Sequence, residues 1–73
     1  MYVYRRIRDM REDRDKTQAE IAAVLDVSRQ QYRRWESGEN EIPVHHMITL
    51  ARYYGVSMDF LTGIVDYIKP ISK

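Results

Sequence analysis

The stretch TQAEIAAVLDVSRQQYRRWESG, residues 17–38, constrains the fold more than any other, because its capping residues define two helices joined by a very short turn. Thr17 and Glu20 form a capping-box pair, in which each side chain can bond the backbone N–H of the other residue. Ser28 can cap a second helix, and Gly38 is the residue favoured just past a helix end. The predicted helices span about 18–25 and 29–37.

The rest of the chain also favours helices, since its apolar residues recur at spacings of three and four and nowhere alternate over the length of a strand. Three further helices are expected, with boundaries at Tyr2 to Glu12, Pro43 to Gly55, and Ser57 to Gly63. The predicted fold is therefore all-α, with five helices. Residues 1–63 form one predicted domain, and residues 64–73 form a short apolar tail.

The composition favours a small binding domain over an enzyme. A chain of 73 residues buries only a modest core, and without cysteine it has neither a disulfide nor a thiolate metal site. His45 and His46 are adjacent, so on a helix they point about 100° apart and are poorly placed to share a metal. Ser28 and Ser57 are already used as caps. We expect no enzymatic activity, no metal and no cofactor.

The sequence also bears on where the protein acts. No apolar run approaches the roughly 18 to 20 residues of a membrane span, and the first residues, MYVYRRIRDMR, are too charged for the core of a secretory signal. The lack of cysteine fits a reducing compartment. We therefore expect a cytoplasmic protein that does not enter a membrane.

Basic residues gather in the first half of the chain. Residues 1–34 hold nine Lys and Arg against six Asp and Glu, whereas residues 35–66 hold one against five. On a helical wheel of the segment from Ser28 to Gly38, one side is polar and the other side is aromatic. The polar side carries Gln30, Arg33 and Arg34, and the other side carries Tyr32, Trp35 and Glu36.

The polar side of this helix has two interpretations. A run of charges is usually a solvated helix face. Arginine and glutamine, however, are also the side chains that pair with the edges of guanine and adenine and with phosphates. A helix joined to its predecessor by a short turn is the arrangement that enters a DNA major groove. The context therefore favours DNA binding.

The chain resembles the Xre-type helix-turn-helix regulators, which include the phage Cro and lambda-type repressors. The resemblance runs from TQAEIAAVLDVSRQQYRRWESG through EIP to MITLARYYGVSMDFLTG, and covers about residues 5–63. It implies a compact lambda-repressor-like domain that binds double-stranded DNA through its third helix.

The resemblance also implies roles for single residues. The positions that match base contacts are Arg29, Gln30 and Arg34. The positions expected at the DNA backbone are Gln18, Arg33, Ser37 and Gln31, the last with the alternative that it caps the helix. Apart from the resemblance, Arg14 and Lys16 in the loop before the second helix, and Asn40, are further candidates. Arg11 and Glu36 match an ion pair that ties the first helix to the third.

The sequence departs from the family pattern at three places. Asp26 stands where the turn usually has glycine, and it is expected to adopt the left-handed conformation at some cost. Tyr32 replaces a more usual aliphatic residue, so its ring is expected in the core, with the alternative that its hydroxyl bonds the backbone. Glu39 and Glu41 stand where phage repressors tend to have basic residues, which is expected to weaken the grip on phosphate.

One helix-turn-helix reads only a few base pairs, so we expect a homodimer on a palindromic operator, with half-sites about 34 Å apart. The apolar residues of the tail could form the dimer interface, or could instead fold back over the first and fifth helices. These residues are Ile64, Val65, Tyr67, Ile68 and Ile71.

The expected function is sequence-specific regulation of transcription, with repression favoured over activation. The alternative is a protein-interaction module, such as an antitoxin or a helical adaptor with weak or no DNA binding, which the acidic second half of the chain supports. A toxin or a second regulator is then the kind of protein partner to expect.

Overall fold

The computed structural model describes residues 3–65 and contains five helices in this range, with no strand. They are α1 (Arg5–Asp13), α2 (Gln18–Leu25), α3 (Arg29–Ser37), α4 (Val44–Tyr54) and α5 (Met58–Thr62). The predicted all-α class and number of helices are confirmed. Of the predicted interface residues in the tail, Tyr67, Ile68 and Ile71 lie outside the described residues.

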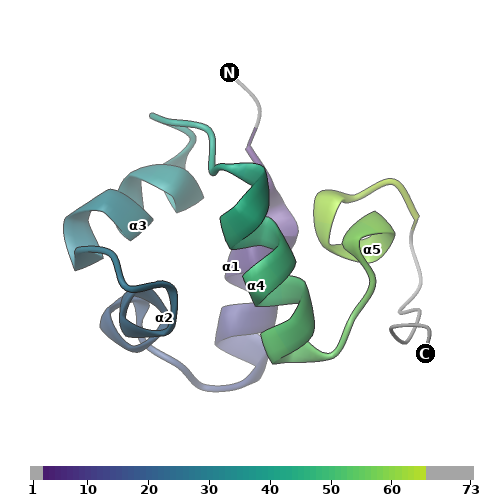
Figure 1. Cartoon of the computed structure of the whole chain (residues 1–73), viewed down its shortest axis with the longest axis horizontal. Helices are drawn as coiled ribbons and strands as arrows, with labels where there is room; N and C mark the ends of the chain where they lie inside the picture. Colours follow the sequence, from purple (N-terminus) through teal and green to yellow (C-terminus); the bar gives the residue numbers. More distant parts are fainter. Residues whose placement is uncertain (1–2, 66–73) are drawn as a thin grey trace.

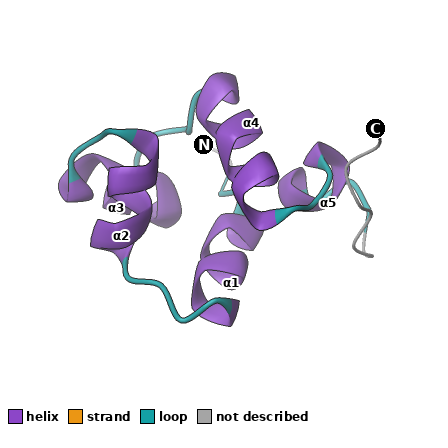
Figure 2. Ribbon diagram, turned by 60° about the horizontal axis from the view of Figure 1, so that its bottom comes forward, coloured by secondary structure: helices purple, strands orange, loops and turns teal. Residues whose placement is uncertain are grey.

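The helices form three groups around one core. α1 and α4 lie in the middle, α2 and α3 pack together on one side, and α5 lies on the opposite side (Figures 1 and 2). The core takes side chains from all five helices and from the segments between them. Its largest fully buried members are Tyr32, Ile7, Ile21, Leu50, Leu61 and Val56. Both the α2–α3 pair and α5 are thereby fixed to the same central helices.

The capping residues define the helix ends as the sequence predicts. The hydroxyl of Thr17 accepts from the N–H of Glu20 at 3.1 Å, and the Glu20 carboxylate accepts from the N–H of Thr17 at 2.8 Å. Ser28 and Ser57 accept a backbone N–H of the first turn of α3 and α5 respectively. Each of these caps satisfies a backbone N–H that has no partner within its own helix. The capping residue and the N–H it bonds are three residues apart, so these helix ends can be predicted from local sequence.

The predicted start of the first helix is wrong. The helix begins at Arg5 rather than at Tyr2, and Tyr4 precedes it with φ −86° and ψ 86° and no side-chain cap. Val3 packs against Gly38, where its side chain fills the place that a β-carbon on Gly38 would take. This contact holds residue 3 beside the end of α3 and outside the helix. A glycine is needed at position 38 for this approach as well as for its φ of +86°.

Asp26 closes α2 in the left-handed conformation, with φ 57° and ψ 44°. Its backbone N–H bonds the carbonyls of Ala22 and Ala23, so the turn into α3 forms without glycine. A residue with a β-carbon pays for this conformation with roughly 1 to 2 kcal/mol of steric strain, although Asp tolerates it better than most.

We predict that Asp26→Gly raises the free energy of unfolding by about 1 kcal/mol, because glycine removes the strain and loses part of the gain to its greater freedom in the unfolded chain. Urea denaturation followed by circular dichroism measures the change. Ala23→Gly, at an exposed position inside α2, is the matched control and lowers stability by about 1 kcal/mol. Equal destabilisation by both changes would contradict the prediction.

Candidate nucleic-acid interface

α3 has one packed face and one open face. Tyr32 and Trp35 are buried on the packed side, at 0% and 5% exposure. Arg29 and Gln30 are exposed, and Arg34 is partly exposed. Within residues 3–65, these last three side chains make no hydrogen bond or ion pair with the protein. Their donors and acceptors are therefore available to a partner.

The packed face of α3 is fixed by the carboxylate of Glu36, whose side chain is only 5% exposed. Arg11 of α1 bonds both of its oxygens, from Nε to Oε2 at 2.7 Å and from Nη2 to Oε1 at 3.1 Å. Gln18 of α2 donates to Oε1 at 3.0 Å, and the Tyr32 hydroxyl donates to Oε2 at 2.5 Å. One carboxylate thus joins three helices. A parallel two-point pairing of this kind fixes orientation as well as distance.

These bonds decide the charge state of Glu36. Burial raises its pKa, but the hydrogen bonds from Arg11, Tyr32 and Gln18 outweigh burial, so the pKa lies below its ordinary value. Burial and the bond to Glu36 raise the pKa of Tyr32, which therefore stays a neutral donor. The ring of Tyr32 lies in the core as predicted, but its hydroxyl bonds this carboxylate rather than the backbone.

Gln18 and Lys16 lie on the same side of the molecule as the start of α3. They line a shallow depression together with Arg11, Thr17, Ala19 and Arg29. Arg11 also donates from Nη1 to the carbonyl of Lys16 at 2.9 Å, which fixes the loop in front of α2. The side-chain amide of Gln18 already donates one hydrogen bond to Glu36. A phosphate at this place would therefore be bound by the second N–H of that amide and by the backbone N–H groups at the N-terminus of α2.

Arg33, on the polar side of α3, has a carboxylate neighbour from the loop that follows the helix. Its Nη1 lies 3.6 Å from Oε2 of Glu39, and both side chains are about half exposed. Ser37 donates to the carbonyl of Arg34 at 3.1 Å and to the Glu39 carboxylate at 3.3 Å. The loop after α3 therefore places a negative charge beside the helix. A helical wheel of α3 could not predict this charge, because Glu39 lies outside the helix.

Arg14 is placed away from the open face of α3. Its Nη2 donates to the carbonyl of Tyr54 at 3.0 Å, at the C-terminal end of α4, and its guanidinium lies 5.8 Å from the centre of the Tyr54 ring. Asn40 is exposed, and its backbone N–H bonds the carbonyl of Arg34. Gln31 is partly buried. Of these three candidates for DNA backbone contacts, Arg14 is the one whose side chain is bonded to another part of the fold.

Arg8 of α1 is not among the residues predicted to contact DNA, but it lies next to several of them. It lines a depression with Gln18, Arg33 and Ser37. The signal for Arg8 is its position one turn before Arg11, because residues three apart share a helix face. The sequence alone does not show that this face of α1 meets α3, and only that packing places Arg8 near the expected contact residues.

The rings of the two histidines lie side by side at the start of α4, tilted by 40° to each other. Their ring centres are 4.0 Å apart, and His46 lies 5.1 Å from the ring of Trp35. Burial and the neighbouring His45 lower the pKa of His46, so it packs as a neutral ring. Across residues 3–65, no group of three or more His, Cys, Asp or Glu side chains could hold a metal ion, and no helix is long and apolar enough to cross a membrane.

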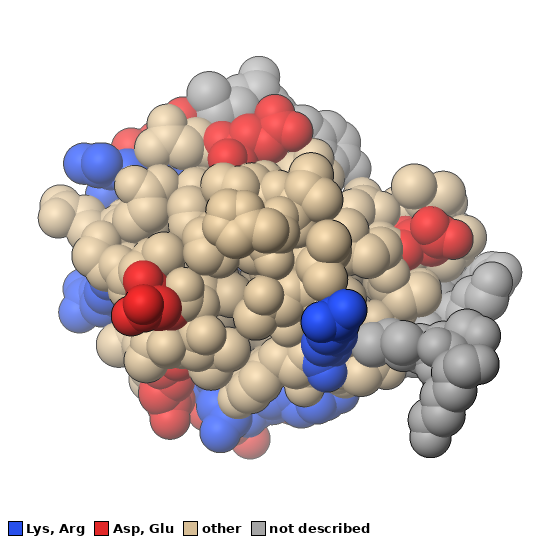
Figure 3. Space-filling view, in the orientation of Figure 1, with Lys and Arg blue, Asp and Glu red and all other residues tan. Residues whose placement is uncertain are grey.

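Basic side chains are not spread evenly over the surface. The surface over α4 is mostly uncharged apart from a basic side chain toward its lower end, and the other Lys and Arg seen in this view lie at its left and lower edges, with acidic side chains among them (Figure 3). α4 exposes apolar side chains, with Val44 at 68% and Tyr53 at 42% exposure. The polar face of α3 and the uncharged face of α4 are thus different surfaces.

This geometry, a short left-handed turn between two packed helices with the second one open to solvent, is that of a helix-turn-helix protein. Residues 7–61 match the family model described as helix-turn-helix, so the chain belongs to this family. The resemblance drawn from the sequence is confirmed.

A relative with measurable similarity is the Bacillus subtilis (strain 168) protein named uncharacterized HTH-type transcriptional regulator YobD, which is 28% identical over 61 residues. The match covers 84% of this chain and 54% of the relative, so the chain spans about half the length of the curated relative it matches. No solved structure matches the chain.

We predict that Glu36→Gln lowers the free energy of unfolding by about 3 kcal/mol at pH 7, because it leaves the mostly buried Arg11 without its counter-charge. The pKa of Glu36 is lower in the folded protein than in the unfolded chain, where it is about 4.3. The ionised carboxylate therefore stabilises the fold at pH values above the unfolded pKa, and this stabilisation is lost as the pH falls through the folded pKa. Urea denaturation at a series of pH values should therefore show the gap between the two proteins closing in acid.

Glu12→Gln is the matched control for this variant. Glu12 is 52% exposed and pairs with Arg8 within α1, so its loss changes stability by less than about 0.5 kcal/mol. A gap between wild type and Glu36→Gln that stays constant from neutral to acid pH would show that the carboxylate charge contributes nothing.

Proposed function

We propose that the protein is a sequence-specific regulator of transcription that binds double-stranded DNA by placing α3 in the major groove. The observation that carries this proposal is the state of Arg29, Gln30 and Arg34, which are at the open face of α3 and unpaired within residues 3–65. Long donors left unpaired on a rigidly held helix suit base edges, since Arg fits guanine O6 and N7 and Gln fits adenine N6 and N7.

Polar groups on either side of the proposed base-contact residues are placed to bind phosphates of the DNA backbone. Lys16, Gln18 and the N-terminus of α2 form one candidate phosphate site, and Arg33 with Ser37 forms another. The Arg33–Glu39 pair is exposed, and such pairs contribute little, so a phosphate can replace Glu39 at small cost. Arg14 does not belong to this set, because its guanidinium group is bonded to the end of α4.

The protein is proposed to act as a homodimer and as a repressor that occupies its operator. The helical body is 32 Å in its longest dimension, comparable with the roughly 34 Å between successive major grooves on one side of DNA, so two adjacent protomers can reach two half-sites. The described chain ends beside α5, opposite to α2 and α3, and Ile64 is 75% exposed there (Figure 2). Pairing through this end would leave both copies of α3 free.

A protein-interaction module is the second candidate, and the apolar side chains exposed on α4 favour it. The two functions differ in their salt dependence. A DNA-binding protein loses affinity with a log–log slope of about −0.9 per phosphate contacted. An adaptor shows no specific duplex binding at low salt. Selection of duplexes from a random pool, followed by titration of the enriched sequence, decides between them.

We predict that Arg34→Ala weakens binding to the selected duplex by about 1 to 3 kcal/mol and relaxes the base preference at one position, because a bidentate contact to guanine is lost. Fluorescence anisotropy with selected and random duplexes measures both effects. Arg33→Ala is the matched control on the same helix, and it should weaken both duplexes alike as a phosphate contact. A loss by Arg34→Ala that is equal on both duplexes would remove Arg34 from the base-reading set.

We predict that truncation after Gly63 converts the dimer to a folded monomer, because it removes the exposed Ile64 and the apolar residues that follow it. Analytical ultracentrifugation gives the mass, and circular dichroism gives the helix content. Loss of helix content without a monomeric folded species would instead assign the tail to the core of its own protomer.

A further inference from the structure

A depression of about 220 Å³ lies between α1 and the end of α3, on the same side as the N-terminus of α2. Its lining residues are Arg8, Arg11, Gln18, Arg33, Glu36 and Ser37. Three guanidinium groups thus face a single carboxylate, and that carboxylate is already paired with Arg11. Within residues 3–65, the other two arginines, Arg8 and Arg33, pair only with exposed carboxylates outside this lining, those of Glu12 and Glu39, and an anion in the depression can replace these partners at small cost.

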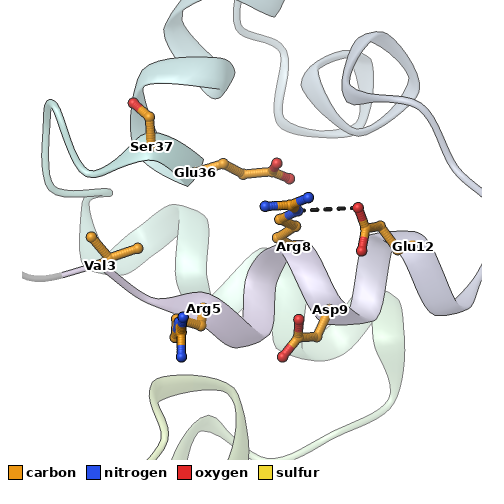
Figure 4. Close-up of a pocket in the computed structure, with 7 residues that line it drawn as sticks. All are labelled: Val3, Arg5, Arg8, Asp9, Glu12, Glu36 and Ser37. Carbon is orange, nitrogen blue, oxygen red and sulfur yellow. Dashed lines mark hydrogen bonds and ion pairs between the residues drawn. The ribbon is translucent and has the colours of Figure 1, made fainter.

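Arg8 is the more exposed of the two α1 arginines that line this depression. Its side chain is 63% exposed, and its Nε lies 3.1 Å from Oε2 of Glu12. Figure 4 draws the neighbouring depression on the other side of Arg8 and shows its guanidinium group raised from α1 toward the end of α3, between the carboxylates of Glu36 and Glu12. An exposed pair of this kind within one helix contributes about 0.3 to 0.5 kcal/mol, so a stronger anion can displace Glu12.

The depression adjoins the one that Lys16 and Arg29 line. Arg11 and Gln18 line both of them. A row of cationic groups therefore runs past the N-terminus of α2, with Lys16 and Arg29 at one end and Arg8 and Arg33 at the other. A continuous row of this kind matches a DNA strand, which presents phosphates in succession, better than it matches one isolated anion.

We propose that Arg8 binds a phosphodiester of the DNA backbone and that Glu12 competes for it in the free protein, so that the DNA-binding surface extends from α2 and α3 onto α1. This inference rests on the proposed function. The contact carries no base information, because it reaches only the phosphate. The contact therefore raises the affinity for every DNA sequence by the same amount, and the pairing of Glu12 with Arg8 in the free protein makes this gain smaller.

The test uses the full chain, the duplex enriched by selection and a random-sequence duplex, with anisotropy titrations over a series of KCl concentrations. Arg8→Ala should weaken both duplexes by the same factor and reduce the magnitude of the salt slope by about 0.9. Arg52→Ala is the matched control, because it removes the same charge from an exposed position on α4 outside both depressions. It should leave the salt slope unchanged.

Competition by Glu12 is tested by a double-mutant cycle. Glu12→Gln should tighten binding to both duplexes in the wild-type background and have no effect in the Arg8→Ala background, since the residue it releases is then absent. Equal tightening in both backgrounds would mean that Glu12 acts only through net charge, and would overturn the competition. Thermal unfolding shows that each variant remains folded.

The outcomes separate this inference from the function on which it rests. If Arg8→Ala has the same affinity and salt slope as Arg52→Ala while Arg34→Ala still loses binding to the selected duplex, the contact from α1 is overturned and the proposed function stands. If the wild-type protein binds neither duplex at low salt, both are overturned. A lower salt slope for Arg8→Ala alone, with equal loss on both duplexes, establishes the contact.

Discussion

The arrangement of the first three helices depends on one mostly buried carboxylate. Glu36 accepts from Arg11 of α1, Gln18 of α2 and Tyr32 of α3 at 2.5 to 3.1 Å. Removing a carboxylate from water is costly, and only this full set of donors offsets the cost. Because the donors come from different helices, the charge is satisfied in one relative placement of the three. The orientation of the open face of α3 follows from that placement.

The same cluster separates residues that hold the fold from residues that are free to bind. Arg11 is used twice, for Glu36 and for the carbonyl of Lys16, so it fixes α3 and the loop before α2 together. Arg29, Gln30 and Arg34 are left unpaired within residues 3–65. A small domain has few side chains to spare, and here the structural role and the proposed binding role fall to opposite faces of one helix.

The helix boundaries were largely predictable because they depend on neighbours in the chain. The capping box at Thr17 and the caps at Ser28 and Ser57 satisfy backbone groups three residues away, so their effect is visible in the sequence. The start of α1 was not, since it depends on Val3 packing against Gly38, a residue of a distant segment. The left-handed turn at Asp26 was expected and is present.

The sequence by itself determined the five helices, the side of α3 that is packed and the family to which the chain belongs, because periodicity and capping are local properties. Only the tertiary structure decided which charges are engaged. It paired Arg33 with Glu39, turned Arg14 toward α4 and brought Arg8 beside the end of α3. The physical reason is that a charged side chain responds to whatever groups lie within a few ångströms of it, and packing brings those groups together from distant parts of the chain.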